Sequence, residues 1–140
     1  MNDIKQLADG IFVSSFRNPQ QIAALGGTFR TIINNRPDGE EPGQPGSAEL
    51  EAAATQAGLR YVHIPVRPGM LGREQISAFS EALASEPKPV LAFCKSGKRS
   101  ASLWALSQAG ERDTESILNA TAAAGYDLTA LKPVIEQLSD

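Results

Sequence analysis

The stretch that decides the fold is PVLAFCKSGKRSASLWAL, residues 89–106. It begins with an uninterrupted apolar run, which is typical of a central parallel strand covered by helices on both faces. A cysteine ends that run, a short basic loop with one glycine follows, and an amphipathic segment comes next. The stretch therefore predicts a strand, a tight loop and a helix, with Cys94 at the carboxyl end of the strand.

The rest of the chain alternates between strand-like and helix-like segments. Apolar and β-branched runs predict further strands at residues 10–15, 29–35 and 59–66. Helical patterns cover residues 18–27, 47–58, 73–85, about 99–110, 114–125 and 128–140. Because strands and helices alternate in this order, right-handed crossovers and a mainly parallel sheet are expected. The predicted fold class is α/β, and ligands of such sheets bind beyond the carboxyl ends of the strands.

The composition is that of a globular protein. With 140 residues, of which 41% are hydrophobic, the chain is expected to form one domain over residues 1–140. A net charge of -3 argues against a nucleic-acid surface, and the lack of a long apolar segment or signal-peptide pattern predicts a cytoplasmic protein that does not enter membranes. One cysteine and one histidine make neither a disulfide nor a zinc cage, so no metal and no cofactor are expected. The oligomeric state has no signal in the sequence.

The loop after Cys94 is expected to bind an anion. Lys95, Ser96, Gly97 and Lys98 lie between the strand and the helix, so several backbone N–H groups would face one concavity at the positive end of the helix. Gly97 allows a backbone conformation that larger residues resist. The same surroundings stabilise a thiolate, which predicts that Cys94 is a nucleophile.

Arg99 and Ser100 complete this predicted site. Arg99 supplies a planar fork that matches two oxygens of a phosphate. Ser100 is a candidate hydrogen-bond donor to the thiolate, and helix N-capping explains a serine there equally well. Lys95 and Lys98 are expected at the solvated rim, where they raise the local positive potential. A buried core residue is the alternative for Cys94, but the glycine and the Arg-Ser pair that follow it favour the anion site.

The segment CKSGKRS, residues 94–100, resembles the phosphate loop of cysteine-dependent protein phosphatases. The wider pattern resembles a bacterial phosphatase-like family that also occurs as a domain of β-lactamase-hydrolase-like proteins, through residues 31–45, 58–66 and 89–106. The resemblance implies the tyrosine/dual-specificity phosphatase fold. It also implies hydrolysis of phosphate monoesters on a protein or small molecule, such as phosphotyrosine or other aryl phosphates. Cys94 would form a thiophosphate intermediate, and Arg99 would bind the phosphate.

Two departures from the general tyrosine phosphatase signature leave other functions open. Phe93 stands where that signature has His, and four residues rather than five separate Cys94 from Arg99. Four is the spacing of many rhodanese sulfurtransferases, so a persulfide carried on Cys94 is a second hypothesis. A non-catalytic phosphate-binding module is a third, because a fold does not fix the chemistry built on it.

A phosphatase of this kind also needs a general acid for the leaving oxygen. The larger family places an Asp on the loop that here reads RPGMLG, residues 67–72. Asp38 is the nearest substitute by loop position, with Glu40 and Glu41 behind it, although Asp followed by Gly is also a standard turn pair. Without an acid, turnover would be slow and biased toward good leaving groups. His63 is expected to be a packed, hydrogen-bonded strand residue.

Overall fold

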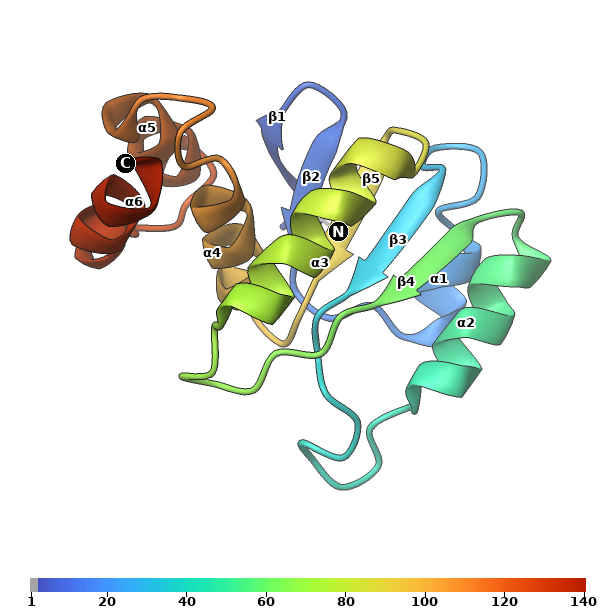
Figure 1. Cartoon of the computed structure of the whole chain (residues 1–140). Coiled ribbons are helices and arrows are strands. Elements are labelled where there is room, and N and C mark those ends of the chain that lie inside the picture. The colour runs from blue at the N-terminus through green and yellow to red at the C-terminus, as the bar shows by residue number, and fades with distance from the viewer. Residues whose placement is uncertain (1–2) are drawn as a thin grey trace.

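The computed structural model describes residues 3–140, which form a five-stranded sheet with helices on both faces (Figure 1). The strands are β1 (Lys5–Ala8), β2 (Ile11–Ser14), β3 (Thr31–Asn34), β4 (Arg60–His63) and β5 (Val90–Phe93). Their order in the sheet is β1-β2-β5-β3-β4. Only the β1–β2 pair is antiparallel, so the predicted α/β fold with a mainly parallel sheet is confirmed.

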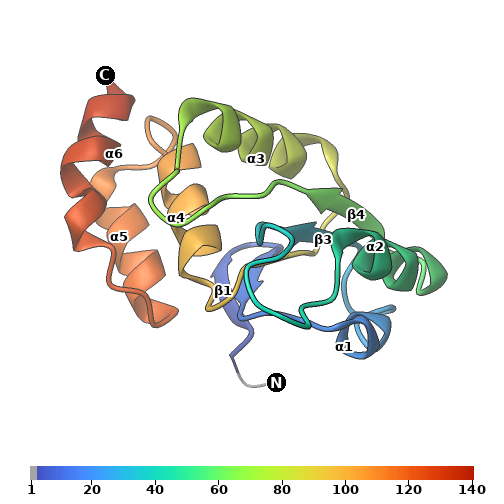
Figure 2. The same cartoon turned by 90° about the horizontal axis from the view of Figure 1, so that it is seen from below.

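The helices divide into two groups. They are α1 (Pro19–Ala23), α2 (Ser47–Gln56), α3 (Arg73–Ser85), α4 (Lys98–Ser107), α5 (Thr114–Ala123) and α6 (Lys132–Ser139), with a short 3-10 turn, η1 (Thr129–Leu131), before α6. Helices α1 and α2 cover one face of the sheet, and α3 and α4 cover the other, with α5 and α6 packed beyond α4 (Figure 2). None of the helices within residues 3–140 has the length and apolar character needed to cross a bilayer.

The central strand β5 is buried on both faces, as its apolar run predicts. Successive side chains of a strand point to opposite faces. Val90 and Ala92 accordingly join the core under α3 and α4, and Leu91 and Phe93 join the core under α1 and α2. Trp104 of α4 is also fully buried in the first of these cores.

Strand β1 is not predicted by the pattern. It lies at the edge of the sheet, where one side makes no ladder hydrogen bonds, and only Leu7 of its residues is buried. One buried side chain in a four-residue strand leaves too weak an alternation to recognise.

The parallel strands bring their carboxyl ends together at one end of the sheet. Asn34 pairs with both Phe93 and His63, and Ser14 pairs with Phe93 on the other side. The loops that follow β3, β4 and β5 therefore leave the sheet at the same end (Figure 1). Cys94 follows the middle strand and lies at the centre of this arrangement.

Candidate functional site

The sulfur of Cys94 lies in a tight turn at the start of α4. Cys94 is fully buried, and the Gly97 N–H donates a hydrogen bond to its Sγ at 3.1 Å. Gly97 caps α4 with a φ of 97°, in the left-handed region that favours glycine. Helix α4 begins at Lys98, one residue before the expected start. The positive end of the helix and an amide N–H thus both face the sulfur.

Arg99 is held firmly on one edge of its guanidinium. Nη1 donates to Oε2 of Glu40 and to the carbonyl oxygen of Val66, both at 2.7 Å, and Nη2 donates to Oε1 of Glu40 at 3.1 Å. These bonds use three of the five N–H groups and leave Nε–H and one Nη2–H. Burial alone would lower the pKa of Arg99, but its contacts with Glu40 and Cys94 raise the pKa above its ordinary value. The guanidinium of Arg99 therefore interacts with both the Glu40 carboxylate and the Cys94 sulfur.

Glu40 links two arginines. Besides Arg99, it accepts a hydrogen bond from Nε of Arg36 at 2.9 Å, and its side chain is only 16% exposed. Hydrogen bonds from Arg99 and then Arg36 hold the pKa of Glu40 below its usual range, despite partial burial. Glu40 is consequently ionised at neutral pH and suited to orienting Arg99 rather than to donating a proton.

Glu41 engages the cations next to this pair. It accepts hydrogen bonds from Nη2 of Arg36 at 2.8 Å and from Nζ of Lys95 at 2.9 Å. Lys95, and then Arg36, lower the pKa of the exposed Glu41 carboxyl. The acidic loop between β3 and α2 thus contacts the basic loop after Cys94 directly, a pairing between residues more than fifty positions apart.

Asp38, the candidate general acid, and Ser100, the candidate donor to the thiolate, both bind groups other than those expected. Asp38 accepts the backbone N–H of Ser47 at 2.8 Å, at the first residue of α2. Ser100 is fully buried and donates to Oδ1 of Asn35 at 2.7 Å, which ties α4 to the end of β3. The N-cap of α4 is Gly97, so the alternative reading of Ser100 as an N-cap is wrong.

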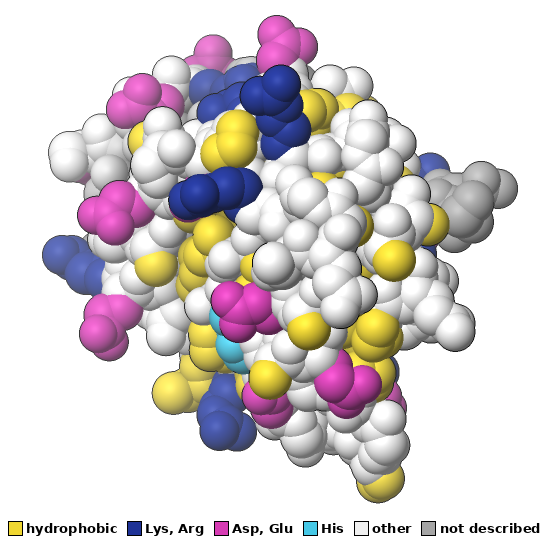
Figure 3. All heavy atoms as spheres, turned by 90° about the vertical axis from the view of Figure 1, so that its right-hand side faces the viewer, with side chains coloured by type: hydrophobic (Ala, Val, Ile, Leu, Met, Phe, Trp, Pro, Cys, Tyr) yellow, Lys and Arg dark blue, Asp and Glu magenta, His cyan; other side chains and the backbone are white. Residues whose placement is uncertain are grey.

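The remaining residues of the loop lie at the rim. Lys95, Ser96 and Lys98 are exposed, and Oγ of Ser96 accepts the Lys98 N–H at 3.3 Å. Within this loop Gly97 and Arg99 contact the sulfur, and the three exposed residues lie on the outer side. His63 is hydrogen-bonded through Nε2 to the carbonyl oxygen of Arg36 at 2.9 Å, in line with its predicted packed role, and part of it reaches the surface (Figure 3, cyan).

Tyr126 is a site residue that the sequence does not single out. It follows α5, thirty positions after Ser96, and its hydroxyl donates to the Ser96 carbonyl oxygen at 3.4 Å. Nothing in the local pattern around GYD distinguishes it from a turn, since only the packing of the chain's last segment against α4 brings it here.

Two cavities flank Arg99. One, of about 440 Å³, is lined by charged residues and a proline: Glu40, Glu41, Arg67, Pro68, Lys95 and Arg99. The other, of about 460 Å³, borders Ser96 and Arg99 and has an apolar wall that includes Leu71, Leu128 and Leu131. A group bound at Arg99 would have a charged cavity on one side and a largely apolar one on the other.

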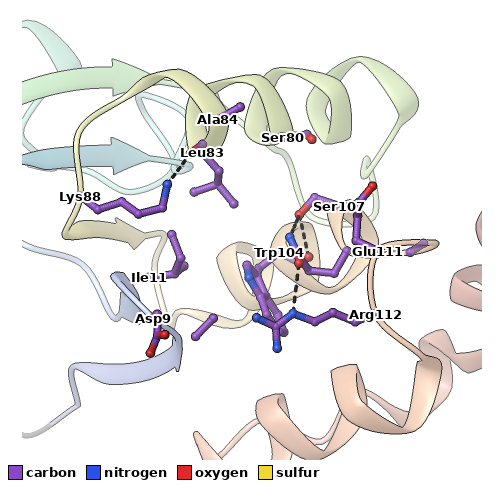
Figure 4. A pocket seen from close by; sticks show the side chains of 13 residues that line it. Asp9, Ile11, Ser80, Leu83, Ala84, Lys88, Trp104, Ser107, Glu111 and Arg112 are labelled. Carbon is purple, nitrogen blue, oxygen red and sulfur yellow. Dashed lines mark hydrogen bonds between the residues drawn. The ribbon is translucent and has the colours of Figure 1, made fainter.

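A further cavity of about 480 Å³ lies beside the carboxyl ends of α3 and α4, remote from Cys94 (Figure 4). Its cations are already engaged. Lys88 Nζ donates to the Leu83 carbonyl oxygen at 2.8 Å, and Arg112 donates to Gln108 and lies 5.4 Å from the centre of the Trp104 ring. Asp9 and Glu111 line the same cavity, so it has no net positive charge to attract an anion. Its size alone therefore does not mark it as an anion-binding site.

Comparison with known proteins identifies the family. The family model described as "Beta-lactamase hydrolase-like protein, phosphatase-like domain" matches residues 3–111. The chain belongs to this family. The match includes the strand, loop and helix around Cys94 and the acidic loop that contacts Arg99, and it ends before α5.

The relatives of this phosphatase-like domain are longer proteins. It is 40% identical over 113 residues to a β-lactamase hydrolase-like protein of Agrobacterium fabrum, in an alignment that covers 79% of this chain and 26% of the relative. A protein of the same description from Xylella fastidiosa is 43% identical over 102 residues, covering 71% and 24%. The chain spans about a quarter of the length of these relatives.

Solved structures of similar fold include phosphatases. A candidate phosphatase from Neisseria meningitidis Z2491 has a TM-score of 0.83 and 30% identity, and the match covers 97% of this chain and 98% of the other. The catalytic core of the PP-IP phosphatase Siw14 from S. cerevisiae has a TM-score of 0.71 and 16% identity, covering 99% and 85%, which shows the fold alone. The tyrosine/dual-specificity phosphatase fold is thus confirmed, and family and neighbours together support a phosphatase.

The Glu40 interactions predict a change in stability with pH. Because the pKa of Glu40 in the folded protein lies below its ordinary value of 4.5, its ion pairs stabilise the fold above about pH 4.5, and this contribution is lost as the pH falls through the folded pKa. Glu40→Gln is expected to lower the free energy of unfolding by about 2 kcal/mol at pH 7 and to lessen its fall in acid.

Urea unfolding of the wild type and Glu40→Gln across this pH range measures both effects. Glu41→Gln is the matched control, because the Glu41 side chain is 50% exposed and its ion pairs are screened by water. An equal loss of stability in the two variants would show that burial of the Glu40 pair does not matter.

Proposed function

We propose that this domain is a cysteine-dependent phosphatase that hydrolyses phosphate monoesters through a thiophosphate intermediate on Cys94. The observation that carries the proposal is the convergence of three groups at the start of α4: the Cys94 sulfur, the Gly97 N–H and the Arg99 guanidinium. Such a site binds oxyanions through backbone N–H groups and a bidentate arginine. Membership of a phosphatase-like family supports this chemistry over sulfur transfer.

The reaction takes two displacements. In the first, the phosphoryl oxygens are bound by the loop N–H groups and by the Arg99 N–H groups that do not bind Glu40 or Val66. The Cys94 thiolate attacks phosphorus, a P–S bond forms, and the P–O bond to the leaving group breaks, with the electron pair going to the leaving oxygen. In the second, water attacks phosphorus, loses a proton to solvent and displaces the thiolate, which releases inorganic phosphate.

The acidic loop prepares Arg99 for this role. Glu40 and the carbonyl oxygen of Val66 bind the Nη edge, so the guanidinium plane is fixed before substrate arrives. Fixed donors stabilise the charge that develops on the transferring group without further rearrangement. Lys98 at the rim adds positive potential that attracts anionic substrates.

Leaving-group departure is expected to occur without strong acid assistance. Glu40 and Glu41 have lowered pKa values, and the Asp38 carboxylate binds the start of α2. The substrates that suit such a site are aryl phosphates, whose leaving groups are stable as anions. The apolar wall of Leu71 and Leu128 beside Arg99 is suited to an aryl ring.

A series of aryl phosphates tests this proposal. We expect kcat/KM to fall at least ~100-fold from 4-nitrophenyl phosphate to phenyl phosphate, because a general acid that would supply a factor of this size is not engaged. Asp38→Ala is expected to give the same dependence on the leaving group. A steeper dependence in Asp38→Ala than in the wild type would instead establish Asp38 as the proton donor.

A further inference from the structure

The last segment of the chain completes the loop that surrounds Cys94. Residues 112–140 lie beyond the part that the family model matches. They nevertheless reach the site, because α5 packs against α4 and the turn after α5 places the half-buried Tyr126 against the loop. There its hydroxyl donates to the carbonyl oxygen of Ser96. A residue outside the matched region therefore contacts the predicted phosphate loop.

Gly97 is covered on the side where a larger residue would carry its Cβ atom. A Cβ atom added at Gly97 would overlap the hydroxyl oxygen of Tyr126 and lie 3.0 Å from its Cζ. The same atom would lie 3.0 Å from the carbonyl oxygen of Ser14 at the end of β2. The side of Gly97 that a larger side chain would occupy is thus covered by the phenol of Tyr126 and by the end of β2.

The conformation of the turn at Gly97 determines which hydrogen-bond donor faces the Cys94 sulfur. In this conformation the Gly97 N–H points at Sγ of Cys94. Burial, and then the negative charge of a Cys94 thiolate, raise the pKa of Tyr126. The phenol of Tyr126 is therefore neutral at pH 7. Glycine has many accessible backbone conformations, so a neighbour that blocks the others has a direct effect on this hydrogen bond.

We propose that Tyr126 is a positioning residue that packs on Gly97 and keeps its N–H directed at the Cys94 sulfur. The proposal rests on the proposed function, in which Cys94 reacts as a thiolate. Tyr126 touches neither the substrate nor the reacting bond and acts through Gly97. The segment after α5 is then part of the catalytic apparatus and not only a cover for α4.

Alkylation of Cys94 by iodoacetamide across a pH range tests this proposal. Cys94 is the only cysteine, so the modification is unambiguous. We expect the midpoint of the pH dependence to rise by about one pH unit in Tyr126→Ala, because the thiolate loses a directed hydrogen bond. Tyr126→Phe retains the ring but loses the hydroxyl that lies nearest Gly97, so a smaller rise of the midpoint is expected. The variants are compared by the midpoint of the pH dependence, because a smaller side chain at position 126 also makes Cys94 more accessible and so changes the absolute rate of alkylation.

Tyr61→Phe is the matched control. The hydroxyl of Tyr61 contacts Asn34 and Ser47 instead of the loop, so its loss reports general loosening. Tyr126→Leu, which retains more apolar volume than Ala, replaces Tyr126→Ala if the latter does not fold. An unchanged midpoint in the Ala and Leu variants, or an equal shift in Tyr61→Phe, would overturn the proposal. Because alkylation needs no turnover, failure of the phosphatase assay alone would refute only the proposed function.

Discussion

Cys94→Ser is expected to reduce hydrolysis of 4-nitrophenyl phosphate by about 10⁴-fold or more, since removal of a nucleophile has effects of this size in related two-step enzymes. A serine hydroxyl is not ionised at neutral pH, and the groups that contact the Cys94 sulfur, the Gly97 N–H and the Arg99 guanidinium, are donors that cannot act as a base to activate it. The variant is nevertheless expected to bind phosphate, because the Gly97 N–H and Arg99 remain.

Steady-state kinetics between pH 5 and 8, together with calorimetric binding of phosphate, measures both halves of this prediction. Retained turnover in Cys94→Ser would exclude the thiolate mechanism. Treatment of the wild type with thiosulfate distinguishes the rhodanese-like alternative from a phosphatase. A persulfide carrier would gain one sulfur atom on Cys94, and a phosphatase would not. Phosphate binding without turnover in either protein would favour a non-catalytic module.

Arg99→Lys is expected to lower kcat/KM by about 10²–10³-fold, as the loss of a fixed charge-stabilising donor does in other enzymes. An ammonium group is a point charge with three donors and no planar fork. It cannot bind Glu40, the Val66 carbonyl oxygen and two phosphate oxygens at once, which the guanidinium has enough N–H groups to do. The charge is kept, so the change isolates geometry from electrostatics.

Arg60→Lys is the matched control for this change. Arg60 lies at the start of β4, exposed and paired with Glu86, at the opposite end of the strand from the site. Its replacement is expected to change kcat/KM less than about twofold, as surface substitutions generally have small effects. Equal losses in the two lysine variants would contradict the role assigned to Arg99.

The strand, loop and helix around Cys94 were predictable because their signals are local. The apolar run predicts a buried strand, and a short loop with one glycine followed by an amphipathic segment predicts a turn into a helix. The rule that parallel strands present ligands at their carboxyl ends then places the loop on the correct end of the sheet. Neighbours in sequence are sufficient for each of these steps.

The partners of these residues were not predictable, because they depend on packing between distant segments. The sequence indicates Glu40 only as a neighbour of Asp38, yet Glu40 binds Arg99 and Asp38 binds the start of α2. Ser100 has the residue type of a donor to the sulfur, but its hydroxyl donates to Asn35 in the folded chain. Tyr126 reaches Ser96 only after α5 has packed on α4. The residue type shows which hydrogen bonds a side chain can make, and the tertiary contacts determine which partner it binds.

The most direct measurement is rapid acid quenching of the enzyme during turnover of 4-nitrophenyl phosphate, followed by mass spectrometry of the peptide that contains Cys94. We expect one phosphoryl group on Cys94, appearing with the first release of nitrophenol and absent from Arg99→Lys at the same time point. Continued release of phosphate while Cys94 stays unmodified, under conditions that preserve a phosphocysteine standard, would contradict the thiophosphate mechanism.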